Sequence, residues 1–325
     1  MDINFYLTLL FDILLALMIT LIVCPRMIPL LHKFKFGQPI REEGPKSHQK
    51  KAGTPTMGGV TFMISILLVM ILNFKLLKID GMIPLFALFG FGIIGLLDDS
   101  IKIIKKQNEG LKPMEKMVLL LIVSTFLSVL GAKVIGTDLK IPFIENTINI
   151  GFIPYVLLMI FYYAAVTNAV NLTDGLDGLA TSVTLMVMTF FAVTAFMFGK
   201  LNIVIFAGIT IGALLGFLKN NAYPAKIFMG DTGSLALGGV VGATAMVLKL
   251  PIFVIIVGGI YVFEALSVII QVTYYKKTKK RFFKMAPVHH HFEALGWKET
   301  KVVTVFTIVT FFLCILGIVA LYFTF

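Results

Sequence analysis

The chain contains only two cysteines, Cys24 and Cys314, among its 325 residues. Both fall inside apolar runs, so a disulfide framework or a cysteine-ligated zinc site is excluded, and core packing is the better interpretation. Charged residues are scarce too, at 14% of the chain, and the sequence lacks an internal repeat or a low-complexity linker. With 58% hydrophobic residues, against about 45–50% in ordinary soluble proteins, a soluble domain is excluded.

Long hydrophobic runs make up most of the sequence. A helix that crosses a bilayer needs about 20 apolar residues, and about ten stretches approach this length. They cover residues 5–31, 57–74, 82–99, 117–135, 154–171, 178–198, 202–219, 234–249, 251–274 and 302–324. The first is too long for a cleaved signal peptide and has no small-residue cleavage site. We therefore predict an all-α polytopic membrane protein with about ten transmembrane helices in a single domain, residues 1–325.

The basic residues give the predicted orientation. Lysines and arginines crowd the loops at residues 32–56, 98–116, 219–233 and 275–300. The opposite loops carry only Lys75, Lys78, Lys133, Lys140, Lys200 and Lys249. Because basic residues favour cytoplasmic loops, the first set is predicted to face the cytoplasm and both termini to lie outside. The net charge of +11 suits anionic lipid head groups, and its division among separate loops argues against nucleic-acid binding.

One external segment has a different pattern. Residues 138–151 alternate polar and apolar side chains around Glu145-Asn146. Alternation with a period of two, interrupted by turn residues, is typical of two paired strands. We therefore predict a small external β-hairpin.

Five aspartates stand where apolar stretches end, and the predicted topology places all of them on the cytoplasmic side: Asp98, Asp99, Asp174, Asp177 and Asp231. Carboxylates against hydrocarbon are costly, so this gathering favours a function. A carboxylate cluster inside a basic rim suggests a divalent cation that holds a phosphorylated substrate. Asp98 and Asp99 also oppose the dipole of the helix that they end, and nearby cations or a metal should compensate.

Two segments supply further polar side chains. Residues 168–178 read NAVNLTDGLDG, in which Asp174 and Asp177 are spaced to share a face of a helical turn. Residues 220–234 read NNAYPAKIFMGDTGS, with Ser234 as the predicted N-cap of the next helix. In this second segment a helix N-terminus favours anions, Phe228 offers a stacking face to a base, and Asn221 offers an amide edge.

A histidine triplet, residues 289–291, lies in the last cytoplasmic loop before Glu293. Consecutive side chains cannot all face one ion on a regular element, so zinc is disfavoured. Imidazoles that donate to phosphate or sugar oxygens fit this loop better. In the ninth stretch, buried pairing or snorkelling to the lipid edge is the simple interpretation of Glu264, and Gly258-Gly259 would let the helix bend or let neighbouring helices approach closely.

Together these motifs resemble the polyprenyl-phosphate N-acetylhexosamine-1-phosphate transferases across essentially the whole chain. Asp98-Asp99, residues 168–178 and residues 230–234 are similar to motifs of the whole superfamily. Residues 50–59 (KKAGTPTMGG) and 287–293 (PVHHHFE) are similar to its phospho-N-acetylmuramoyl-pentapeptide transferase (translocase I) branch.

The resemblance implies an enzyme that transfers phospho-MurNAc-pentapeptide from its UDP carrier to undecaprenyl phosphate, giving lipid I and UMP for peptidoglycan synthesis. It also implies a Mg2+ requirement and a homodimer among the lipids of a bacterial cytoplasmic membrane. Because both reactants are anionic, a metal together with lysine and histidine charge would lower their repulsion. Direct attack is favoured over a covalent phospho-aspartate, and the lipid tail is expected in an apolar groove beside the bent ninth stretch.

The resemblance also implies roles for particular residues. Asp231 is the expected Mg2+ ligand. The catalytic set is expected to be Asp98, Asp99, Lys102, Asp231 and His290. The lipid phosphate is expected at Asp98, Lys102 and Lys116, with Lys116 chosen from the loosely matched stretch that begins at Lys106. The donor is expected at Lys51, Thr56, Asn171, Asp174, Gly175, Leu176, Asp177, Asn221, Phe228, Gln271, His289, His290 and His291.

Three alternatives stay open. A related transferase that uses UDP-GlcNAc would share the chemistry, and residues 287–293 argue against it. An ion-coupled transporter would place its charges near the bilayer midplane on broken helices of paired repeats, whereas only Glu264 and Asp12 lie deep here. A membrane scaffold without catalysis would leave the five aspartates unexplained.

Overall fold

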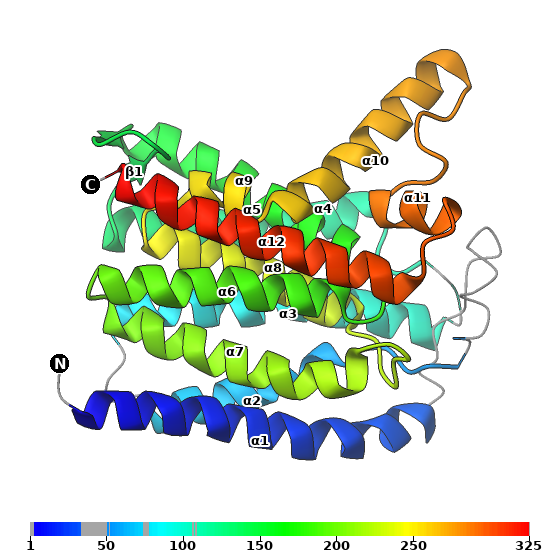
Figure 1. The fold of residues 1–325 in the computed structure, drawn as a ribbon, viewed down its shortest axis with the longest axis horizontal. Helices are drawn as coiled ribbons and strands as arrows, with labels where there is room; N and C mark the ends of the chain where they lie inside the picture. The colour runs from blue at the N-terminus through cyan, green and yellow to red at the C-terminus, as the bar shows by residue number, and fades with distance from the viewer. Residues whose placement is uncertain are drawn as a thin grey trace.

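Most of the chain folds into helices that run side by side (Figure 1). The computed structural model describes residues 3–33, 51, 53–73, 78–105, 107 and 109–324, so most of the basic loop 32–56 and Lys106 lie outside the described residues. The helices are α1 Ile3–Lys33, α2 Gly59–Leu72, α3 Ile79–Ile104, α4 Pro113–Val134, α5 Phe152–Thr173, α6 Leu179–Met197, α7 Leu201–Asn221, α8 Gly230–Val247, α9 Val254–Val257, α10 Gly259–Thr278, α11 Val288–Ala294 and α12 Glu299–Tyr322. Each of the ten predicted stretches contains a helix, which confirms the predicted all-α architecture.

The outer helices present apolar side chains to their surroundings. Among the described residues, seven helices are long and apolar enough to cross a membrane, or up to eight spans if the broken pair 251–278 counts as one. Phe161 on α5, Ile122 on α4 and Phe312 on α12 are 73%, 60% and 62% exposed. Apolar surface of this kind is unfavourable in water and suits lipid. The chain is therefore a multi-pass membrane protein, as predicted.

Helix α8 occupies the centre of the bundle. It has 18 residues, and every residue from Thr232 to Val247 is buried. Because protein surrounds it, α8 needs no apolar surface for lipid and can carry glycines that permit close packing. A Cβ atom at Gly95 of α3 would overlap the backbone carbonyl of Asp231. This contact holds the start of α8 against the end of α3.

The ninth predicted span is broken. A 3₁₀ turn at Pro251–Phe253 leads into α9, and α10 leaves at an angle of 83°. At the bend, a Cβ atom on Gly258 would lie 2.7 Å from the carbonyl oxygen of Val254. The predicted bend is confirmed, and Figure 1 shows α10 standing away from the bundle on its way to α11.

The predicted hairpin is also present. Strand β1 (Asp138–Lys140) pairs antiparallel with β2 (Thr147–Asn149), with Leu139 opposite Ile148. Hydrogen bonds from Lys249 and Asn149 lower the pKa of Asp138. Figure 1 places the hairpin at the same end of the bundle as the start of α1 and the end of α12, and α11 at the other end. The first and last helices and the hairpin thus meet at one side, as the predicted topology requires.

Candidate active site

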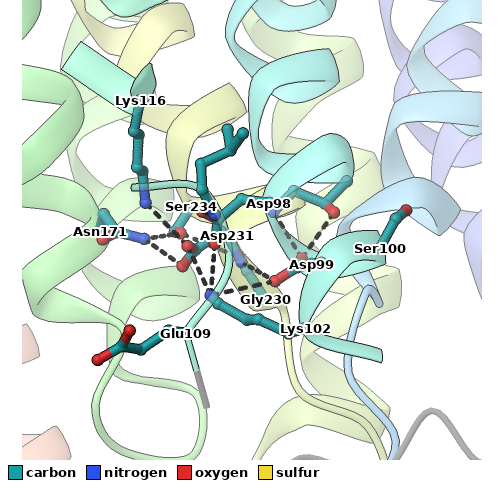
Figure 2. A network of polar contacts seen from close by, with 12 residues as sticks. Asp98, Asp99, Ser100, Lys102, Glu109, Lys116, Asn171, Gly230, Asp231 and Ser234 are labelled. Carbon is teal, nitrogen blue, oxygen red and sulfur yellow. Dashed lines mark hydrogen bonds and ion pairs between the residues drawn. The ribbon is translucent and has the colours of Figure 1, made fainter. Parts of the chain in front are cut away.

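Three carboxylates meet where the end of α3 faces the start of α8 (Figure 2). Asp98 and Asp99 come from the last turns of α3, and Asp231 comes from the first turn of α8. One oxygen from each side chain lies within 4.8 Å of the others. The sequence places these residues far apart, so only the packing of α3 on α8 creates the cluster.

Both helices extend further than predicted. Helix α3 continues to Ile104 rather than ending at Asp99, and α8 begins at Gly230 rather than at Ser234. The prediction that Ser234 is the N-cap is therefore wrong. Its hydroxyl instead donates to the carbonyl oxygen of Gly230 at 2.9 Å.

The N-terminus of α8 is capped from α3 instead. Asp99 Oδ2 accepts hydrogen bonds from the Thr232 backbone N at 2.9 Å and from its Oγ1 at 2.7 Å. Asp99 Oδ1 accepts the Asp231 backbone N at 3.3 Å. A carboxylate that accepts the free amides of a first turn stabilises that helix end, both by hydrogen bonding and through the dipole. Asp99 therefore fixes the position of Asp231.

Lys102 stands among the three carboxylates. Its Nζ atom lies 2.6 Å from Asp98 Oδ2, 2.9 Å from Asp231 Oδ2 and 3.7 Å from Asp99 Oδ1. Lys116, from the first turn of α4, approaches Asp231 Oδ2 to 2.8 Å. The expectation that cations compensate the paired aspartates is confirmed. The two ammonium groups offset part of the negative charge of the three carboxylates.

Hydrogen bonds from two further segments orient the carboxylates. Asn171, in the last turn of α5, donates through Nδ2 to Asp231 Oδ1 and Ser234 Oγ, at 2.8 Å each. The backbone N of Leu111 donates to Asp98 Oδ1 at 2.9 Å. The structure thus places Asn171 on the carboxylate cluster. Oxygen ligands of this kind suit a hard cation, so Asp98, Asp99 and Asp231 could hold a metal ion.

A second polar group joins four separate segments. Lys51 Nζ lies 2.7 Å from Asp177 Oδ1 and 2.6 Å from Glu299 Oε1. The same Glu299 oxygen accepts the Asp177 backbone N at 2.6 Å, and Asp177 Oδ2 accepts the Ala225 backbone N at 2.9 Å. Glu299 is not among the predicted site residues, because it follows a lysine at the start of α12 and has no motif around it.

The turn between α5 and α6 carries Asp177 of this second group and, three residues before it, Asp174. The side chain of Asp174 is only partly exposed. Its pKa is raised to about 8, mainly by burial and then by the negative charges of Asp231, Asp99 and Asp177. The Asp174 carboxyl therefore takes up a proton at a higher pH than an ordinary aspartate does. Beside it, a Cβ atom on Gly175 would overlap the imidazole of His289. Leu176 is buried in the core.

The segment before α8 pairs with the segment before α2. Phe228 donates its backbone N to the Pro55 carbonyl at 2.8 Å, and its own carbonyl accepts the Gly58 backbone N at 2.9 Å. Thr56 is buried at this contact, whereas Phe228 is only partly buried. Asn221 is buried, and its amide accepts from Thr181 Oγ1 at 2.7 Å and donates to the Ile227 carbonyl at 3.1 Å. These contacts turn the Asn221 amide toward the protein.

The three histidines face different partners. His289 Nδ1 lies 3.0 Å from Glu264 Oε1, and both side chains are fully buried. His290 Nδ1 lies 2.8 Å from Glu293 Oε2. His291 Nδ1 accepts the Lys284 backbone N at 3.1 Å. The buried pairing expected for Glu264 is confirmed.

Gln271 closes the connection between α10 and α11. Its Oε1 atom accepts the backbone N atoms of Phe282 and Phe283, at 3.1 and 2.9 Å. The structure thus places Gln271, a residue predicted to bind the sugar-nucleotide donor, on the projecting helix α10, where it holds the loop at Phe282 and Phe283.

Comparison with known proteins identifies the family. Residues 81–249 match the model of glycosyl transferase family 4, and residues 51–62 match phospho-N-acetylmuramoyl-pentapeptide-transferase signature 1. The chain is 58% identical over 313 residues to the phospho-N-acetylmuramoyl-pentapeptide-transferase of Clostridium novyi (strain NT), with 96% of each chain covered. The chain belongs to the phospho-N-acetylmuramoyl-pentapeptide-transferase family. Two further relatives, from Clostridium kluyveri (strain ATCC 8527) and Clostridium botulinum (strain Eklund 17B), are 57% and 56% identical, covering 96% and 97% of this chain and 99% and 97% of theirs.

Membership of the phospho-N-acetylmuramoyl-pentapeptide-transferase family confirms the predicted resemblance. It makes the chain an enzyme of the transferase class, which removes the transporter and the scaffold as alternatives. The longer matched range contains the carboxylate cluster and the turn at residues 174–177, and the shorter one contains Lys51 and Thr56. The histidine triplet and Glu299 lie beyond both ranges.

Proposed function

We propose that the chain transfers phospho-MurNAc-pentapeptide from UDP-MurNAc-pentapeptide to undecaprenyl phosphate, giving lipid I and UMP for peptidoglycan synthesis. The relatives that carry the transferase name match the chain over nearly its full length. The observation that carries the proposal is the cluster of Asp98, Asp99 and Asp231 with Lys102 and Lys116, at one end of a membrane bundle. A water-soluble anionic donor and a membrane-bound lipid phosphate can meet at such an end.

The proposed reaction is a direct attack. An oxygen of the lipid phosphate attacks the donor phosphorus that bears the sugar, and the new P–O bond forms as the bond to the UMP oxygen breaks. UMP leaves with that electron pair. Lys102 and Lys116 carry the positive charge that lowers the repulsion between the two anions. Asp98, held by Leu111 and Lys102, would position the lipid phosphate or accept its proton.

We propose Mg2+ as the metal. Its preference for carboxylate oxygens and substrate phosphates fits the cluster, and when bound it would neutralise charge on the pyrophosphate. Asp231 and Asp98 are the proposed ligands, because Asp99 already accepts hydrogen bonds from the first turn of α8. His290, next to Glu293, would bring further positive charge to the donor.

The donor is proposed to lie beside the cluster. Phe228 would stack on the uracil, with Lys51, Thr56 and the turn from Asp174 to Asp177 around the nucleotide. His291 would lie on the sugar and peptide side. The buried His289, packed against Gly175, and Asn221, through its two internal hydrogen bonds, would support the pocket. The proposal also places the enzyme in the bacterial cytoplasmic membrane as a homodimer, with this site on the cytoplasmic face, because basic loops favour that side.

Purified protein with UDP-MurNAc-pentapeptide, undecaprenyl phosphate and Mg2+ should release UMP. UDP-GlcNAc should not replace the donor, and a His290→Gln variant should turn over more slowly while its thermal melting stays normal. Comparable rates with both donors would favour the related UDP-GlcNAc transferase. Absence of UMP in several detergents and lipids would refute the proposed function.

Phe228→Ala should weaken the binding of UMP. Stacking on a base is worth about 1–3 kcal/mol, so roughly 5- to 150-fold weaker binding is expected. Isothermal titration calorimetry with UMP measures the change directly. Phe217→Ala, in the fully buried aromatic contact with Phe62, serves as a control for lost packing, because it should lower the melting temperature instead. Unchanged UMP affinity in Phe228→Ala would assign the ring to lipid or core.

A further inference from the structure

Glu299 has a place in the fold that neither helix formation nor surface charge explains. An acidic residue in the first turn of a helix is favoured by the dipole even when it points into solvent. Glu299, the first residue of α12, instead turns inward, and its side chain is only 8% exposed. One of its oxygens meets both Lys51 Nζ and the Asp177 backbone N, at 2.6 Å each.

We propose that Glu299 is a positioning residue that pre-forms the nucleotide pocket of the donor. Its contacts close a ring through Lys51, Asp177 and Ala225. The ring ties together the segment before α2, the turn between α5 and α6, the segment before α8 and the start of α12. The first three are the segments that the proposed function assigns to the nucleotide, so this role rests on that function.

The charges in the ring explain how Glu299 would act. Burial by itself lowers the pKa of Lys51, but the hydrogen bonds and charges of Asp177 and Glu299 outweigh it, and the pKa is raised overall. The ammonium therefore stays charged and has two carboxylates to hold it, with its side chain 15% exposed. A long lysine side chain loses rotamer freedom when it binds a ligand, and prior immobilisation reduces that cost.

The Glu299→Gln substitution removes the negative charge of the side chain and keeps its size, so it tests the charge alone. In Glu299→Gln the amide oxygen can still accept the Asp177 backbone N, but the ion pair with Lys51 is lost. Because charge-assisted contacts are the stronger ones, we expect the KM for the donor and the Kd for UMP to rise roughly 10-fold, with a smaller change in kcat. Glu299→Asp, which keeps the charge, should recover part of the affinity.

The Mg2+ dependence supplies a second readout. The contacts of Glu299 run to Lys51 and Asp177, whereas Lys102 and Lys116 are the cations at the carboxylate cluster. The Mg2+ concentration for half-maximal activity should therefore match that of the wild type. Glu145→Gln, at the exposed tip of the hairpin at the other end of the bundle, is the matched control and should change neither constant.

A double-mutant cycle with Lys51→Met distinguishes positioning from general stability. If Glu299 acts through Lys51, adding Glu299→Gln to Lys51→Met should leave the UMP affinity where Lys51→Met alone puts it. Additive losses, or a lower kcat at unchanged KM, would show that Glu299 only stabilises the fold. If the wild type releases UMP and the Glu299→Gln variant has the wild-type KM for the donor and Kd for UMP, this role alone is overturned. An inactive wild type that binds no UMP would overturn the proposed function and this role together.

Discussion

Replacing Asp231 by asparagine should abolish UMP release and leave the protein folded. Asparagine keeps the size of the side chain, and its amide oxygen can still accept the hydrogen bond from Asn171. It removes the negative charge that Lys102 and Lys116 share at 2.9 and 2.8 Å. The proposed metal site loses its principal ligand with that charge. Loss of one electrostatic group in an active site costs about 10²- to 10³-fold, and loss of the metal adds to this.

The matched control is Asp138→Asn. Asp138 is also an aspartate in a short ion pair, 2.6 Å from Lys249, but it lies in the hairpin at the other end of the bundle. Asp138→Asn should retain turnover, and both variants should melt near the wild-type temperature. Chelation of divalent cations should reproduce the Asp231→Asn phenotype in the wild type, and added Mg2+ should restore only the wild type. Full Mg2+-dependent turnover by Asp231→Asn would move the proposed metal to the other aspartates.

The architecture could be predicted from the sequence because a bilayer imposes a length and a polarity on each helix. The ten apolar stretches, the hairpin and the break at Gly258 all follow from local patterns. The ends of α3 and α8 could not be predicted in the same way. Gly-Asp-Thr-Gly has the composition of a turn, and it becomes helical at residues 230–233 because Asp99 on another helix accepts its free amides. A cap supplied by tertiary contact leaves no local signal.

The site shows the same division. The five aspartates could be singled out from the sequence because charge at the edge of a span is unusual, but only Asp98, Asp99 and Asp231 meet in one cluster, and Asp177 pairs with Lys51 instead. The placement of Asn171 on Asp231, and of Glu299 on Lys51, depends on which helices pack together. Glu299 stands alone in the sequence, since the nearest acidic residue before it, Glu293, belongs to the histidine segment. Its partner Lys51 is separated from it by most of the chain, so no spacing rule could connect them.

The contact between α3 and α8 leads to a second large expected effect. Gly95→Ala should both destabilise the protein and strongly reduce turnover. The added Cβ would overlap the carbonyl group of Asp231 and come within 2.5 Å of the Thr232 backbone N. Backbone atoms cannot rotate away as a side chain can, so α8 as a whole must shift away from α3. Overpacking of a core costs about 1–3 kcal/mol, and a misplacement of about 1 Å at reacting groups can cost roughly 10²-fold in rate.

Gly90→Ala on the same helix tests whether the position of the glycine matters. There the added Cβ would lie 2.8 Å from Cγ1 of Val123 on α4, a side chain that can rotate away, and no carboxylate of the cluster is involved. Its turnover should stay within a few-fold of the wild type, and its melting temperature should fall less than that of Gly95→Ala. Because Asp99 binds the amides of α8 only while the two helices touch, Gly95→Ala should also weaken the response to Mg2+. If Gly95→Ala kept wild-type turnover and Mg2+ dependence, the close packing of α3 on α8 would not be what aligns Asp98 and Asp99 with Asp231.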